Sequence, residues 1–203
     1  VRTSRLRPKR KLATRALSSS QRRRGIIAPI GVPFNAFRTH QGGQIQFQRL
    51  FTNPTITQSD GTGEIDTHFD VSPIAAAENW ADYSTIYDSY QVVSMTLHIY
   101  PQRREQGAGE LVGAMGLGID RNSSQDPATW IRVLNIPGHK VISLMDSRAF
   151  HYTWKILPEE RPTFNPIATP QVGCIMVVGT GGAIDTNQFF SYQTWTVAFK
   201  GRS

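Results

Sequence analysis

The sequence contains a single cysteine, Cys174, among 203 residues. One cysteine cannot form an intramolecular disulfide, so the chain is not a small scaffold held together by disulfides. Cys174 lies in the apolar run GCIMVVG, which is typical of a small, buried hydrophobic side chain. We therefore expect its thiol to have a packing role.

Long hydrophobic runs are also missing. No stretch reaches the ~18 consecutive apolar residues that a membrane-spanning helix needs, so no membrane insertion is expected. The start of the chain has no apolar segment of the kind that a secretory signal carries.

Catalytic motifs and clusters of metal ligands are absent from the sequence. The histidines are dispersed, and the Gly-rich run GAGELVGAMGLGID lacks the Gly-Lys-Ser/Thr end of a phosphate-binding loop. His68 alternates with Asp66 and Asp70, but a solvated or interface face explains this stripe better than a metal site does. Asp120, which follows a predicted strand, is an equally weak Ca²⁺ ligand. The sequence predicts no enzyme, no metal and no cofactor.

Acidic residues are absent from the first 25 positions, where ten basic residues occur. They are Arg2, Arg5, Arg7, Lys9, Arg10, Lys11, Arg15, Arg22, Arg23 and Arg24. This segment carries +10 and the whole chain +7, so residues 26–203 carry 7 − 10 = −3. The excess of positive charge therefore belongs to the first segment alone.

Residues 1–25 are interpreted as a basic arm. A segment with this charge and few large apolar residues cannot bury enough surface to fold alone. A solvated charge run and a nuclear-localisation signal are milder interpretations. Ten basic residues without an acid favour neutralisation of nucleic-acid phosphates. No aromatic residue lies among them, so little sequence preference is expected.

A hinge rich in Pro and Gly is predicted at 26–43, and a single β domain at 44–203. Runs that alternate between apolar and polar residues, separated by turn residues, recur along the domain. They predict eight strands, near residues 44–51, 64–71, 90–101, 111–119, 141–145, 149–156, 172–178 and 192–200. Asp126-Pro127 is expected to begin a short helix that runs to Leu134. This pattern is typical of an all-β sandwich of two four-stranded antiparallel sheets.

The stretch WADYSTIYDSYQVVSMTLHIYP, residues 80–101, is predicted to form a corner of the core. Its aromatic residues follow helical spacing first, and the pattern then changes to strict alternation along a strand. The predicted structural corner consists of Trp80, Tyr83, Tyr87, Asp88 and Tyr90.

The strand near 172–178 is apolar on both faces, although a sandwich strand normally shows one face to water. Two explanations stay open. The Pro-rich segment 158–170 could cover the second face, or a neighbouring subunit could. In the second case Ile175 and Val177 are the candidate subunit interface.

Two stretches of the chain resemble a known family. They are residues 83–94 running into the strand that ends at Pro101, and residues 113–120 followed by Asp126-Pro127 and a short helix. Both are similar to parts of the coat proteins of small icosahedral viruses with one jelly-roll shell domain. The similarity is greatest to tombusvirus-like shell domains and to capsid proteins of small circular single-stranded DNA viruses.

The resemblance implies an eight-stranded jelly roll that assembles with copies of itself into an icosahedral shell of ~60 copies or a multiple. It also implies that the arm packages a single-stranded genome. RNA and DNA satisfy the arm equally, because phosphate is common to both. The expected location is the virion, assembled inside a host cell, with the nucleus as one option. Surface projections are expected to be loops such as 101–110 or 158–170.

The alternative is a cellular β-sandwich binding module, lectin-like or chaperone-like, with a basic tail. Carbohydrate-binding modules commonly need exposed aromatic residues, whereas most aromatic residues here lie on predicted inward faces. Histone-type chaperones usually carry acidic tracts, and this tail is basic. The capsid interpretation is therefore favoured.

Overall fold

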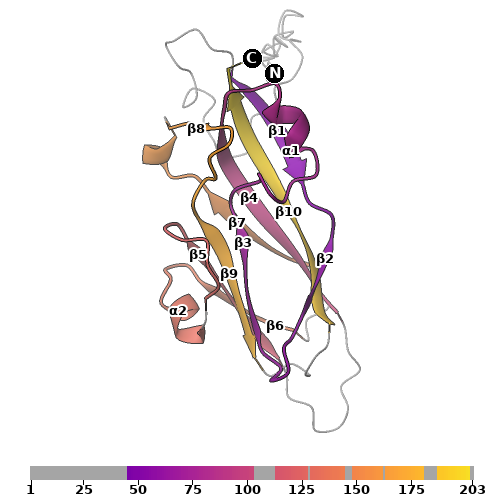
Figure 1. Cartoon of the computed structure of the whole chain (residues 1–203). Helices are drawn as coiled ribbons and strands as arrows, with labels where there is room; N and C mark the ends of the chain where they lie inside the picture. Colours follow the sequence, from indigo (N-terminus) through magenta and orange to yellow (C-terminus); the bar gives the residue numbers. More distant parts are fainter. Residues whose placement is uncertain are drawn as a thin grey trace, which may run out of the picture.

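The computed structural model describes residues 45–102, 113–127, 129–144, 148–161, 163–180 and 187–201. Two antiparallel sheets pack face to face and enclose the core (Figure 1). The predicted basic arm at 1–25 and the hinge at 26–43 lie outside the described residues.

The larger sheet has six strands. Its main order is β1 (Gln46–Phe51), β10 (Asn187–Lys200), β4 (Ser89–Pro101) and β7 (Phe150–Lys155). Two short strands extend it, because β2 (Thr55–Gln58) pairs with β10 and β8 (Asn165–Pro166) pairs with β4. The second sheet has four strands in the order β3 (Ile65–Asp70), β9 (Cys174–Thr180), β5 (Ala114–Asp120) and β6 (Lys140–Ser143).

The chain crosses between the two sheets several times, as a jelly roll requires. The paired strands β1 and β10 are the first and last of the described chain, and β9, which precedes β10, lies in the other sheet. The predicted all-β jelly-roll sandwich is therefore confirmed. The predicted count of four strands in each sheet is wrong for the larger sheet, because β2 and β8 add to it.

The long strand β4 shows the alternation that its sequence predicts. Met95, Leu97 and Ile99 are fully buried, whereas Thr96 and His98 between them are partly exposed. The core side of the paired strand β10 carries Trp195, Val197 and Phe199, all buried. The Trp195 Nε1–H donates to the Val71 carbonyl at 2.8 Å and ties the larger sheet to the end of β3.

Two short α-helices flank the sandwich, α1 (Trp80–Ser84) and α2 (Trp130–Leu134), with a 3-10 turn at Pro158–Glu160. The predicted start of the second helix at Asp126-Pro127 is wrong. Thr129 caps α2 instead, since its hydroxyl accepts from the backbone N–H of Arg132. Within the described parts of the chain, no helix is both long and apolar enough to span a membrane.

Candidate functional site

The predicted structural corner packs around one ring, Phe199 of β10. Trp80, Tyr83 and Tyr87 from α1 and the following turn approach it with ring centroids at 5.8, 5.2 and 4.9 Å. Trp80 also meets Tyr90 edge-on at 4.8 Å. Trp80, Tyr87 and Tyr90 are buried and Tyr83 is partly exposed, so these residues build core contacts between α1 and the larger sheet.

The fifth corner residue, Asp88, is exposed. Its backbone carbonyl accepts from the N–H of Ile167 at 3.0 Å. Its side chain lies against Gly201, where an added Cβ would be 2.3 Å from Oδ2. Gly201 has a φ of +81°, so glycine suits this position for both reasons.

The prediction that Ile175 and Val177 form a subunit interface is wrong. Both side chains are fully buried in the main core between the two sheets. The opposite face of β9, with Cys174, Met176 and Val178, forms a second cluster. This second face is covered by side chains from α2 and the residues after it, namely Val133, Trp130 and Ile136. Among the described residues, the cover is therefore α2 and not segment 158–170.

Glycines of β5 let α2 approach the sheet closely. A Cβ added to Gly116 would lie 2.8 Å from Cζ3 of Trp130, and one added to Gly118 would lie 2.7 Å from Cδ1 of Ile136. Side chains of α2 and the residues after it therefore occupy the space that larger residues at these positions would fill. Burial on this second face raises the pKa of the Cys174 thiol to about 11.

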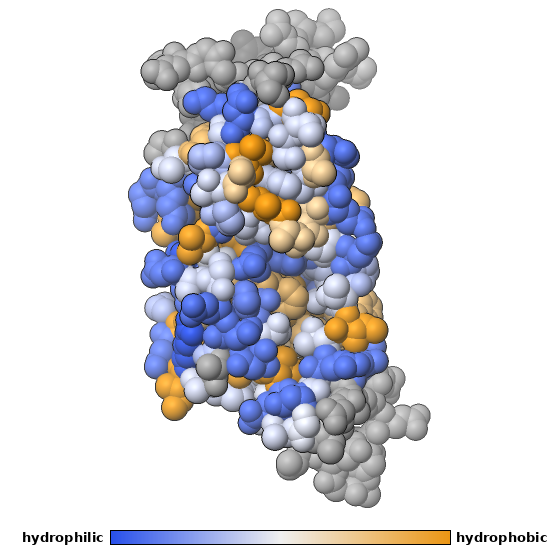
Figure 2. Space-filling model, viewed as in Figure 1, coloured by the Kyte–Doolittle hydropathy of each residue, from blue (hydrophilic) through white to orange (hydrophobic). Residues whose placement is uncertain are grey.

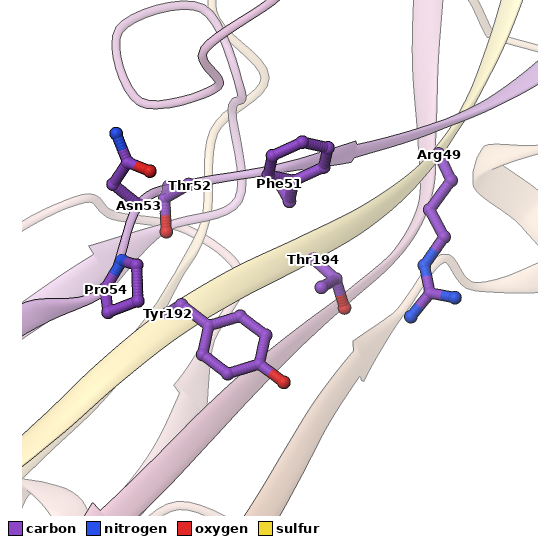
Figure 3. Close-up of a pocket in the computed structure, with 7 residues that line it drawn as sticks. All are labelled: Arg49, Phe51, Thr52, Asn53, Pro54, Tyr192 and Thr194. Carbon is purple, nitrogen blue, oxygen red and sulfur yellow. The ribbon is translucent and has the colours of Figure 1, made fainter.

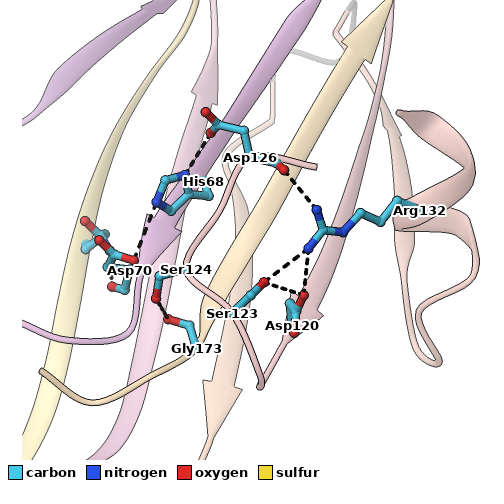
Figure 4. Close-up of polar contacts among 9 residues, drawn as sticks. His68, Asp70, Asp120, Ser123, Ser124, Asp126, Arg132 and Gly173 are labelled. Atoms are coloured by element: carbon cyan, nitrogen blue, oxygen red, sulfur yellow. Dashed lines mark hydrogen bonds and ion pairs between the residues drawn. The ribbon is translucent and has the colours of Figure 1, made fainter. Parts of the chain in front are cut away.

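Two members of the predicted stripe on β3, His68 and Asp70, are part of a polar cluster between strand ends and loops (Figure 4). His68 Nδ1 lies 2.7 Å from Asp126 Oδ1, and Nε2 lies 3.6 Å from Asp70 Oδ1. The Asp126 side chain therefore binds His68 of β3 instead of capping α2.

Asp120 is held by three donors in the same region (Figure 4). It accepts from the Asn122 N–H at 2.8 Å, the Ser123 hydroxyl at 2.7 Å and Arg132 Nη2 at 3.2 Å. Burial alone would raise the pKa of Asp120, but these hydrogen bonds together hold it below its usual value. Its oxygens thus serve the loop between β5 and α2. Among the described residues, no group of three or more His, Cys, Asp or Glu is placed to hold a metal.

The two sheets differ in charge. None of the six strands of the larger sheet contains Asp or Glu, although Arg49, Lys155 and Lys200 occur there. The strands of the smaller sheet contain Asp66, Asp70 and Asp120 with Lys140. The larger sheet is therefore basic and the smaller one acidic.

Aromatic side chains form a row on the outer face of the larger sheet. The ring of Tyr192 stacks on His98 at 4.4 Å, and Tyr100 stacks on Phe190 at 4.8 Å. The hydroxyls of Tyr100 and Tyr192 lie 3.4 Å apart and join the two pairs. In the view of Figure 2, hydrophobic residues appear in separate groups on a mostly hydrophilic surface.

His98 and His151 are cross-strand partners on β4 and β7, with their Nδ1 atoms 2.9 Å apart. His98 Nε2 also lies 3.0 Å from the Thr194 hydroxyl. Burial, and then the nearby charges of His151 and Arg49, lower the pKa of His98. The imidazole of His98 is therefore held in its neutral form at neutral pH.

A hollow of about 510 Å³ opens on the same face between β1 and β10 (Figure 3). Arg49 and Phe51 line it from β1, Tyr192 and Thr194 from β10, and Asn53 from the turn that follows β1. Register brings these residues together, since Phe51 pairs with Thr194 although they are far apart in the chain. Sequence reasoning missed the hollow because only strand pairing creates it.

No family model matches the sequence, and no curated protein sequence does. The fold does have matches among solved structures. The chain superposes on Mud crab tombus-like virus with a TM-score of 0.58 at 12% identity, covering 82% of this chain and 92% of that one. The decameric BFDV capsid protein gives 0.51 at 14% identity, covering 78% and 100%.

A third match is the semi-empty VLP of the nodavirus of the giant freshwater prawn Macrobrachium rosenbergii. Its TM-score is 0.57 at 12% identity, covering 82% of this chain and 98% of that one. These matches span nearly the whole of each neighbour. The chain therefore has the jelly-roll fold of viral capsid proteins.

Proposed function

We propose that this chain is a viral capsid protein that assembles with copies of itself into an icosahedral shell around a single-stranded genome. The observation that carries the proposal is the jelly roll, because the matched folds are those of capsid proteins over nearly their full length. The proposed partners are other copies of the chain and RNA or DNA, and the proposed location is the virion. The role includes no catalytic step.

The distribution of charge supports a division of labour within the chain. Residues 26–203 carry a net charge of −3, so copies of the domain can approach one another with little net repulsion. The ten basic residues of the arm would neutralise phosphates. In a shell of ~60 copies the arms would supply ~600 positive charges, on the scale of a short single-stranded genome.

Particle formation tests the proposal directly. The full chain is expressed, purified and examined by size-exclusion chromatography and negative-stain electron microscopy. A capsid protein should elute as large assemblies that appear as particles of uniform diameter. A monomer or small oligomer under all assembly conditions would instead favour the cellular binding module.

A further inference from the structure

The hollow between β1 and β10 has the chemistry of a nucleotide site. We propose that it binds one base of single-stranded nucleic acid, with the adjoining phosphate on Arg49, and that the outer face of the larger sheet is turned toward the genome. This inference rests on the proposed function and adds a second nucleic-acid surface to the arm.

The first argument is charge. Arg49 is exposed and lies on a sheet whose strands contain no Asp or Glu. Two other arginines do have acidic partners, Arg121 with Glu160 at 3.5 Å and Arg132 with Asp120 at 3.2 Å. Among the described residues no carboxylate pairs with Arg49. An exposed guanidinium with no paired carboxylate, on a sheet whose strands carry no acid, is suited to a phosphate.

The second argument is the shape and lining of the hollow. Its 510 Å³ falls within the ~300–1,000 Å³ of small-ligand sites. Phe51 is 46% exposed, and the rings of Phe51 and Tyr192 both line the hollow (Figure 3). Tyr192 is partly exposed, and one face of its ring stacks on His98. Every base has a π-face, so exposed rings such as Phe51 bind bases with little sequence preference.

The third argument is that the site is held in place. Tyr192 is fixed from the side of β4, because its ring stacks on His98 with an interplanar angle of 7°. His98 is fixed in turn by Thr194. The Asn53 amide donates to Glu78 at the edge of the hollow, which orients its carbonyl group. A ligand therefore meets side chains that need little reordering.

The fourth argument is continuity with the arm. Arg49 and Phe51 lie on β1, the first strand of the described chain, and residues 1–25 precede that strand in the sequence. The arm is thus tethered to the edge strand of this sheet through residues 26–45. An acidic protein face would satisfy the charge of Arg49, but it would not use the exposed rings beside the hollow in this way.

The test compares two oligomers of equal length with the full chain: a fluorescent oligothymidylate and the same backbone without bases. The arm binds phosphates and should hold both, whereas the hollow should favour the oligomer that carries bases. We expect the wild-type chain to bind oligothymidylate about tenfold tighter than the abasic oligomer.

The variants Phe51→Ala and Tyr192→Ala should bring this ratio close to one and leave abasic affinity unchanged. Tyr192→Phe keeps the ring and should keep the ratio. Phe190→Ala is the matched control, because Phe190 is a 37% exposed ring of the same face that does not line the hollow. Circular dichroism of each variant verifies folding.

Ultraviolet cross-linking of the wild-type chain to oligothymidylate gives an independent readout. Adducts on peptides of β1 or β10 support the site, and adducts confined to residues 1–44 overturn it. A wild-type ratio near one also overturns it, as does a Phe51→Ala variant that keeps the ratio but loses particle yield, which would make this face a contact between copies. Failure of both oligomers to bind would overturn the site and would also count against packaging by the arm, whereas equal, tight binding of both overturns the site alone.

Discussion

At the scale of single residues, Ile175 and Val177 show how a correct pattern led to a wrong role. The sequence revealed two apolar faces on this strand, and both faces are buried. Which element covers each face depends on packing between distant segments, and the alternation along one strand carries no information about that. α2 covers one face and the opposite sheet covers the other.

Val177→Glu should therefore destabilise the isolated subunit. The charge would enter the core without a partner, at a cost of more than about 3 kcal/mol in the free energy of unfolding. Val172→Glu is the control, because Val172 is 57% exposed and the change should stay within about 0.5 kcal/mol. Urea unfolding followed by circular dichroism measures both. A folded Val177→Glu subunit of normal stability would refute the assignment of Val177 to the core.

Cys174 gives a second prediction at this scale. Burial raises the pKa of its thiol to about 11, two units above the ordinary value of 9.0, so the reactive thiolate is ~100-fold rarer near pH 8. Ellman's reagent should react at least ~100-fold more slowly with the folded protein than with protein in denaturant. Equal rates in the two states would show that the second face of β9 is open to solvent.

At the scale of elements, the sequence predicted β4 well and the short strands poorly. β4 has 13 residues with one face on the core, so its alternation is long enough to be read. β2 has four residues, mostly polar, and β8 has two, one of them Pro166. Strands this short have no readable period, and only pairing with β10 and β4 defines them.

The start of α2 was mispredicted for a related reason. Asp126-Pro127 has the local signature of a helix start, yet Asp126 binds His68 from a strand 58 positions away. A tertiary contact of this kind competes with capping by the same side chain. Thr129 therefore caps α2 in place of Asp126. The hollow was missed likewise, because Phe51 and Tyr192 meet only through the pairing of β1 with β10.

Packing of α2 on β5 can be tested at Gly116. A methyl group there would lie 2.8 Å from the rigid ring of Trp130, so Gly116→Ala should cost about 1–3 kcal/mol of unfolding free energy. Gly61→Ala is the matched control, since no described atom lies within 4 Å of its added Cβ. Thermal unfolding of both variants measures the difference. Equal stabilities would mean that α2 does not rest on this strand as described.

At the scale of the whole molecule, charge is distributed very unevenly along the chain and between the two sheets. The arm carries +10 and the remainder −3, and within the domain the acid-free larger sheet is opposed to an acidic smaller one. The jelly roll can be predicted from alternation and turns because those signals are repeated along the chain. The orientation of the domain in the proposed shell would depend on contacts between copies, and no single strand encodes it.

The most direct test of the account is the nucleic-acid content of particles made by the full chain and by a chain that lacks residues 1–25. Particles are treated with nuclease, and the ratio of absorbance at 260 and 280 nm is measured together with protein mass. The account predicts that the truncated chain stays folded and that its particles protect several-fold less nucleic acid per subunit. Its remaining binding to oligonucleotides should also depend less steeply on salt. Equal amounts of protected nucleic acid in both kinds of particle would contradict the account.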